Sequence, residues 1–116
     1  MFTIATDPTR RLLRITLEGF WDKHTFERFK REARDAALTL PGEPGDHYVI
    51  ADASRAAIQS QEVADMLAAY MTGKTFRFAF VTGNAVIKIQ ARRLFKESGV
   101  IIVDTVEEAE HALFQN

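Results

Sequence analysis

The sequence contains no cysteine, which excludes disulfides, thiolate catalysis and cysteine-ligated metal sites. It also lacks an excess of charge of either sign, because 15 basic and 16 acidic residues leave a formal charge of -1. No overall electrostatic field therefore draws the protein to nucleic acid or anionic lipid. An electrostatic partner must instead be recognised by a local patch of charge.

Long apolar runs are absent as well. No stretch approaches the roughly 20 apolar residues of a membrane-spanning helix, and the first residues do not combine a basic segment with a long apolar one. We therefore expect a cytoplasmic protein with no transmembrane segment. Hydrophobic residues make up 47% of the 116 residues, which fits one globular domain over residues 1–116.

Motifs for metal or nucleotide chemistry are also missing. The three histidines, His24, His47 and His111, are scattered along the chain. Glu107 and His111 have i,i+4 spacing, but a catalytic metal requires a third protein ligand. We expect no metal site and no cofactor.

The residues needed for serine hydrolysis and for nucleic-acid binding are also incomplete. Asp52 stands two residues from Ser54, but no base partner for a serine nucleophile is recognisable. Phe76, Phe78 and Phe80 alternate along a predicted strand, which indicates a core and not a surface that stacks nucleic-acid bases. We therefore expect a protein that is not an enzyme and does not bind nucleic acid.

The first third of the chain predicts a hairpin followed by a helix. Residues 2–5 and the alternating residues 13–18 flank a turn at 7–10, which is typical of two antiparallel strands. Asp22 is a suitable N-cap for an amphipathic helix that stops near Pro41.

Three strand–helix units follow a loop at residues 41–46. Their apolar patterns predict these pairs: Tyr48–Ala51 with Gln61–Met71, Phe76–Val81 with Ala85–Lys96, and Val100–Val103 with Thr105–Phe114. Asp104 and Glu107 have the spacing of a capping box. Alternating strands and helices predict parallel pairing with right-handed crossovers. The expected fold is α/β, with a mixed five-stranded sheet (N-terminal antiparallel hairpin, then parallel βα units) and four helices.

Three short stretches carry a family resemblance: Glu18–Trp21, the Asp52-Ala53-Ser54 corner with a serine at the start of the next helix, and Val100–Ala109. Together with the order of elements, they resemble the STAS domain of sulfate transporters and anti-sigma-factor antagonists. The likeness is closer to the stand-alone bacterial branch, which is related in fold to lipid-transfer CRAL-TRIO domains. The resemblance implies a STAS-like fold and a regulatory, non-enzymatic module.

The resemblance also singles out one serine. In anti-sigma-factor antagonists, a serine in an Asp-Ser-x-Gly stretch is phosphorylated to break a partner complex. Ser60 occupies that position, while Gln59 replaces the acid and Glu62 the glycine. The alternative is that Ser60 is the N-cap of its helix. Phosphate at a helix N-terminus is electrostatically favourable, so Ser60 is a candidate switch.

Polar and aromatic residues gather where the predicted strands end. Parallel sheets tend to bind ligands beyond the carboxyl ends of their strands. The candidates for a ligand or partner surface there are Trp21, Asp52, Ser54, Thr82 and Asn84. They suit a small amphipathic ligand. Alternatively, the polar residues shape strand exits and cap helices, and Trp21 seals the sheet.

The third predicted helix carries a basic patch, made of Lys88, Arg92, Arg93 and Lys96. Ile89 lies among these cations, outside the apolar stripe. The face suits an acidic partner, a phosphate head group or a membrane surface. A plain solvated face is the alternative, and Ile89 is also consistent with a homodimer contact.

Two functions remain open. A regulatory or protein-interaction module of STAS type, acting on a protein partner, is favoured by the resemblance. The alternative is a small carrier that binds an apolar or amphipathic, lipid-like ligand at the strand carboxyl ends. Whether the protein is a monomer or a homodimer stays open at this point.

Overall fold

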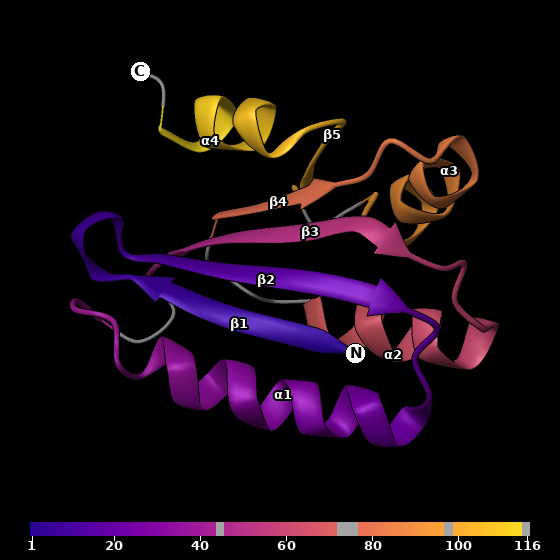
Figure 1. Cartoon of the computed structure of the whole chain (residues 1–116), viewed down its shortest axis with the longest axis horizontal. Coiled ribbons are helices and arrows are strands. Elements are labelled where there is room, and N and C mark those ends of the chain that lie inside the picture. Colours follow the sequence, from indigo (N-terminus) through magenta and orange to yellow (C-terminus); the bar gives the residue numbers. More distant parts are fainter. Residues whose placement is uncertain (44–45, 72–76, 97–98, 115–116) are drawn as a thin grey trace.

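The structure is a computed structural model that describes residues 1–43, 46–71, 77–96 and 99–114. One five-stranded sheet in the order β1-β2-β3-β4-β5 carries helices on both faces (Figure 1). The elements are β1 (Phe2–Asp7), a short 3-10 turn (Pro8–Arg10), β2 (Leu12–Gly19), α1 (Lys23–Ala37), β3 (Tyr48–Ala56), α2 (Gln61–Met71), β4 (Arg77–Val81), α3 (Ala85–Leu94), β5 (Ile101–Val103) and α4 (Val106–Phe114).

The pairing of the strands confirms the predicted topology. β1 and β2 are antiparallel, with Phe2 opposite Leu17. β2, β3, β4 and β5 then pair in parallel, each with the next. Apolar side chains alternate between the two faces of the sheet, so both faces must be covered. The helices α1, α2 and α3 pack on one face and α4 packs on the other.

β3 is longer than expected, and this changes the role of its polar residues. The strand continues to Ala56 instead of ending at Ala51. Thr16 of β2 pairs with Asp52, whereas Glu18 pairs with Arg55, so β3 contains one extra residue in between. The expected Asp52-Ala53-Ser54 corner is therefore a β-bulge inside the strand. The sequence prediction failed because backbone pairing with β2 continues past these polar side chains.

The helix caps were predicted with mixed success. Asp22 caps α1 as expected, since its side chain accepts a hydrogen bond of 2.7 Å from the backbone N–H of Thr25. Asp104 does not cap α4. The cap is Thr105, whose Oγ1 accepts a 3.1 Å bond from the backbone N–H of Glu108. Thr105 and Glu108 have the same capping-box spacing as the predicted pair, so spacing alone did not decide between them. Asp104 forms an ion pair with Lys88 instead.

Candidate ligand-binding cavity

A cavity of about 810 Å³ lies between the sheet and the helices α1, α2 and α3. Its lining is mostly apolar. The strands contribute Leu13, Ile15, Leu17, Val49, Ala51, Ala53, Ala56, Phe78 and Phe80. The helices contribute Phe26, Phe29, Ala33, Ala37, Val63, Ala64, Leu67, Tyr70, Ile87, Ala91 and Leu94. The space therefore lies in the main core and not on the outer surface of the sheet.

Two aromatic clusters form opposite walls of this cavity. On the α1 side, the Trp21 ring lies 5.2 Å from that of Phe29, and the Phe26 ring lies 6.1 Å from that of Tyr70. On the α3 side, the rings of Phe80 and Phe95 are 5.6 Å apart. The helix α2 contacts both α1 and α3, and it faces the cavity with the smaller side chains Val63, Ala64 and Leu67, which leaves room between the aromatic walls.

The cavity reaches the surface at both ends of the parallel strands. Exposed Ala57 belongs to the lining at the carboxyl end, just after β3, together with half-buried Gln59 and Gln90. Exposed Arg34 and Leu38 belong to it at the amino end, where α1 finishes and β3 begins. The nine residues of β3 separate these ends by about 26 Å, at about 3.3 Å from one residue to the next. An elongated ligand would suit such a shape.

Two titratable side chains in the lining are shifted by burial. Burial raises the pKa of the Tyr70 phenol above its ordinary value. Burial lowers the pKa of His47, and the nearby Arg11 guanidinium lowers it further, against a smaller opposite effect of Asp46. Both groups are therefore neutral at pH 7, which suits an apolar cavity.

Gln59 fixes the carboxyl end of the cavity. Its Oε1 accepts a 2.9 Å hydrogen bond from the backbone N–H of Trp21, and its Nε2 donates to the carbonyls of Gly19 and Ala57 at 3.1 and 2.7 Å. These bonds join the exits of β2 and β3 and hold buried Trp21 against the cavity. Gln59, which replaces the acid of the phosphorylation motif, thus has a structural role.

Ser60 is the N-cap of α2. Its Oγ accepts a 3.2 Å hydrogen bond from the backbone N–H of Val63, and the side chain is half-buried. The capping role that the sequence allows is therefore present. Phosphorylation of Ser60 stays a prediction.

The five residues predicted for a ligand or partner surface fall into separate groups. Trp21 alone among them lines the described part of the cavity. Asp52 and Ser54 bond each other within β3, with the Asp52 carboxylate accepting from the Ser54 hydroxyl at 2.5 Å. Thr82 and Asn84 shape the turn from β4 to α3, where Asn84 caps the helix. All five residues lie at the same end of the sheet. The four polar ones make local contacts within a bulge or a turn and do not form one site.

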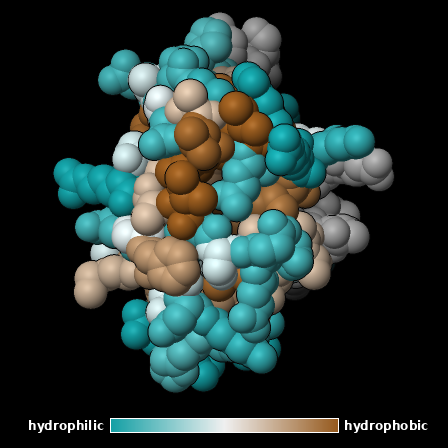
Figure 2. All heavy atoms as spheres, turned by 90° about the vertical axis from the view of Figure 1, so that its right-hand side faces the viewer, coloured by the Kyte–Doolittle hydropathy of each residue, from teal (hydrophilic) through white to brown (hydrophobic). Residues whose placement is uncertain are grey.

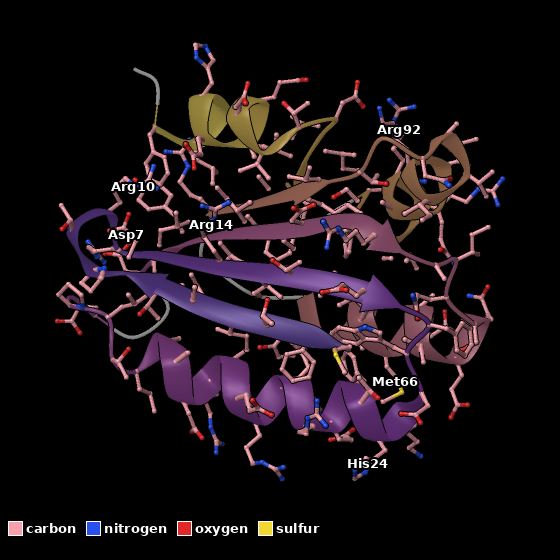
Figure 3. All side chains as sticks on the ribbon, in the orientation of Figure 1. Asp7, Arg10, Arg14, His24, Met66 and Arg92 are labelled. Carbon is pink, nitrogen blue, oxygen red and sulfur yellow. The ribbon has the colours of Figure 1, made fainter. Side chains whose placement is uncertain are left out.

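The predicted basic patch lies on α3 and directly after it, since the helix ends at Leu94 and Lys96 follows, and the patch is only partly exposed. Lys88 is drawn to Asp104, and its side chain is only 22% exposed. Arg92, Arg93 and Lys96 are exposed, and the Arg92 side chain extends away from α3 (Figure 3). None of these three forms an ion pair with a residue in the described ranges. Three cations, and not four, are therefore presented to solvent.

Exposed apolar side chains gather beside this patch, at the carboxyl end of the sheet. We call them the apolar rim, and they are Met1, Phe20, Ile58, Val86 and Ile89, each at least 51% exposed. Figure 2 views this end and shows apolar surface running across it. The sequence pointed to Ile89 and to the Glu18–Trp21 stretch that contains Phe20. Met1, Ile58 and Val86 were missed, because an apolar residue outside a strand or outside the apolar stripe of a helix carries no periodic signal.

Within the described ranges, no cluster of three His, Asp or Glu side chains is arranged to hold a metal ion. Among the same residues, no helix has the length and apolarity needed to cross a bilayer. The chemistry that the described site offers is burial of apolar surface beside a few hydrogen-bonding groups.

Comparison with known proteins supports the fold. No model of a known protein family matches the sequence, and neither does any curated protein. A solved structure from Shewanella loihica PV-4, described as an uncharacterized protein of the DUF3478 family with a SpoIIAA-like fold, is similar with a TM-score of 0.71. The match covers 97% of this chain and 93% of that chain, at 14% sequence identity.

This chain has the SpoIIAA-like fold. The SpoIIAA-like fold is that of STAS domains and anti-sigma-factor antagonists, so the STAS-like fold implied by the sequence resemblance is confirmed. At 14% identity, the likeness establishes the fold alone. The function must be argued from the residues of this chain.

Proposed function

We propose that the protein is a small carrier that holds one apolar or amphipathic ligand in the cavity beneath its sheet. The observation that carries this proposal is the volume of about 810 Å³ among side chains of the main core. Ligand pockets typically measure about 300–1,000 Å³ and are lined mainly by apolar and aromatic side chains. The proposed site is the cavity under the sheet and not the outer edge of the strands.

Ordinary packing does not account for so much space. Protein interiors are close-packed and hold few voids larger than a water molecule. Water in such an apolar space lacks hydrogen-bonding partners, so an apolar molecule displaces it favourably. A ligand that fills this cavity would restore the dispersion contacts that the lining side chains lack.

Filling the cavity tests the proposal. Ala64 on α2 is 2% exposed and lines the cavity, so Ala64→Phe should abolish binding of the neutral fluorescent probe N-phenyl-1-naphthylamine. Ala69→Phe is the matched control, because Ala69 is an exposed residue of the same helix outside the described lining. It should leave probe binding unchanged. Absence of probe binding to the parent protein, or equal loss in both variants, would refute the carrier.

A second function, the regulatory or protein-interaction module of STAS type, is favoured by the apolar rim. Apolar side chains that cluster on a surface often mark a binding site. Ser60 caps α2 at the same end of the sheet, close to the rim residue Ile58 in sequence. Native mass spectrometry of gently purified protein distinguishes the two functions. A co-purifying ligand supports the carrier, whereas a stoichiometric protein partner that Ser60→Asp displaces supports the module.

A further inference from the structure

Charge is distributed unevenly along the cavity. All the Asp, Glu, Lys and Arg residues in its described lining come from one helix, α1, and they are Glu27, Lys30, Arg31 and Arg34. At the carboxyl end, the polar lining residues Gln59 and Gln90 are neutral amides. The cavity therefore has an apolar interior, an uncharged carboxyl end, and a border of cations that runs along α1 toward the amino-end mouth.

The described lining contains three basic residues, Lys30, Arg31 and Arg34, and one acidic residue, Glu27. Lys30 is paired with Glu27, with 3.3 Å between Nζ and Oε2. Arg34 lies 3.9 Å from Asp35, but both side chains are largely exposed, at 72% and 66%, so this pair is weak. Arg31 forms no ion pair with any residue in the described part of the chain. The mouth of the cavity at this end therefore keeps two guanidinium groups available to an anion.

Arg31 and Arg34 are placed to act on one ligand group. Residues three apart in a helix lie on the same surface, so both side chains border the same stretch of the mouth. Guanidinium groups bind carboxylates and phosphates through paired hydrogen bonds. His47 also lines this end, and it is held neutral by burial and by Arg11, so the positive charge there comes from the helix α1.

We propose that the ligand is an anionic, single-chain amphiphile whose carboxylate or phosphate binds Arg31 and Arg34, while its apolar chain lies in the cavity. This inference rests on the proposed carrier function and specifies its ligand. The apolar chain extends from α1 toward Ala53, Leu67 and Phe80, between the aromatic walls. The cations thus determine both the class of ligand and its direction in the cavity.

Competition between ligands with different head groups tests the inference. Dodecanoate, dodecyl phosphate and dodecanol share one apolar chain, and each is titrated against bound N-phenyl-1-naphthylamine. A charged hydrogen bond contributes about 1.5–3 kcal/mol, so at least one of the two anions should displace the probe at a concentration about tenfold or more below that of dodecanol. The preferred anion shows whether the site selects carboxylate or phosphate.

A pair of matched double variants identifies the residues responsible. Arg31→Gln with Arg34→Gln should weaken binding of the anion far more than binding of dodecanol, and so remove most of the preference for the anion. Lys23→Gln with Arg28→Gln removes the same charge from α1 at positions outside the described lining, and it should keep the preference. This control separates a local head-group site from the general attraction of a basic helix.

The outcomes separate this inference from the carrier proposal. If dodecanol competes as well as both anions, or if the Arg31 and Arg34 variant keeps the preference, the head-group inference is overturned and the carrier stands. If none of the three compounds displaces the probe, or the probe does not bind the parent protein, the carrier fails and the inference fails with it.

Discussion

The two faces of the sheet are covered in different ways. On the α4 face, one nine-residue helix places Ala109 and Leu113 against Leu12, Ile50 and Val81, and each of these side chains is at most 2% exposed. On the opposite face, three helices bring large aromatic residues and still leave a cavity of about 810 Å³. The face that is covered by more helices is thus the less tightly packed one. A small residue such as Ala109 lets a helix approach the sheet closely, whereas large rings such as Phe29 and Phe80 keep a helix farther from the sheet.

Side-chain contacts also join the β1–β2 turn to α4. Arg10 bonds Asp7 at 2.8 Å at the turn between β1 and β2, where Figure 3 shows the two side chains together. Its guanidinium also lies 3.7 Å from Glu110 and stacks 5.0 Å from the Phe114 ring centre of α4. The hairpin is therefore joined to the C-terminal helix. We infer that the α4 face supplies rigidity and that the three-helix face supplies volume for binding.

The largest expected effect comes from deleting the same side chain on each face. Ile50 and Ile15 lie on neighbouring strands, are 1% and 3% exposed, and face α4 and the cavity respectively. Ile50→Ala should lower the free energy of unfolding by about 4 kcal/mol, within the range for buried isoleucines. Ile15→Ala should cost only about 2 kcal/mol, because helices beside an open cavity can relax into the space that the deletion leaves. Urea denaturation monitored by circular dichroism measures both values.

Ligand-free protein is the appropriate sample, and the parent protein is the common reference. Equal costs for the two deletions would mean that the three-helix face is packed as densely as the α4 face. The comparison on which the carrier proposal depends would then be lost.

Enlarging an alanine on each face should give a smaller difference in stability. Here the cost comes from overpacking and not from lost contacts. Ala79 on β4 is 0% exposed beneath α4, so Ala79→Leu should overpack that face and cost about 2–3 kcal/mol. Ala51 on β3 is 3% exposed and lines the cavity, so Ala51→Leu should cost less than about 1 kcal/mol. Thermal unfolding gives the two differences. A heavier penalty at Ala51 than at Ala79 would contradict the assignment of the free space to that face.

Much of the fold was predictable because its signals are local. Alternation in β2, the cap at Asp22 and the helical spacing of α2 each depend on neighbouring residues, and each appears in the structure. The end of β3 was not predictable in this way. It is set by pairing with β2 across a bulge, and a polar side chain such as Asp52 does not show whether its backbone stays in the sheet.

The candidate site was less predictable than the fold. Alternating apolar residues in β2 and β3 show that one face of the sheet is buried, but they do not show whether the covering helices fill the space. Arg31 and Arg34 were missed for a related reason. On a sequence, cations beside an apolar stripe indicate a solvated helix face, and only the arrangement of the helices places these two at the mouth of a cavity.

The smallest expected effect concerns pH, and it sharpens the comparison because it involves the three-helix face alone. Burial, and secondarily Arg11, holds the pKa of His47 below that of an unfolded histidine, against a smaller effect of Asp46. The unfolded chain therefore binds the proton more readily. Stability should fall as the pH drops through about 6.5, the ordinary pKa of histidine, toward the lower folded value.

His47→Gln should flatten this dependence between about pH 7.5 and 5.5, a window above the range in which carboxylates titrate. His24→Gln is the control for loss of a histidine, because exposed His24 lies on the outer surface of α1 and away from the cavity (Figure 3), and the slope of His47→Gln is compared with it. Urea midpoints across this window measure the slope. If the slope persists in His47→Gln, another group causes the pH dependence. His47 would then not be a property that distinguishes the three-helix face from the α4 face.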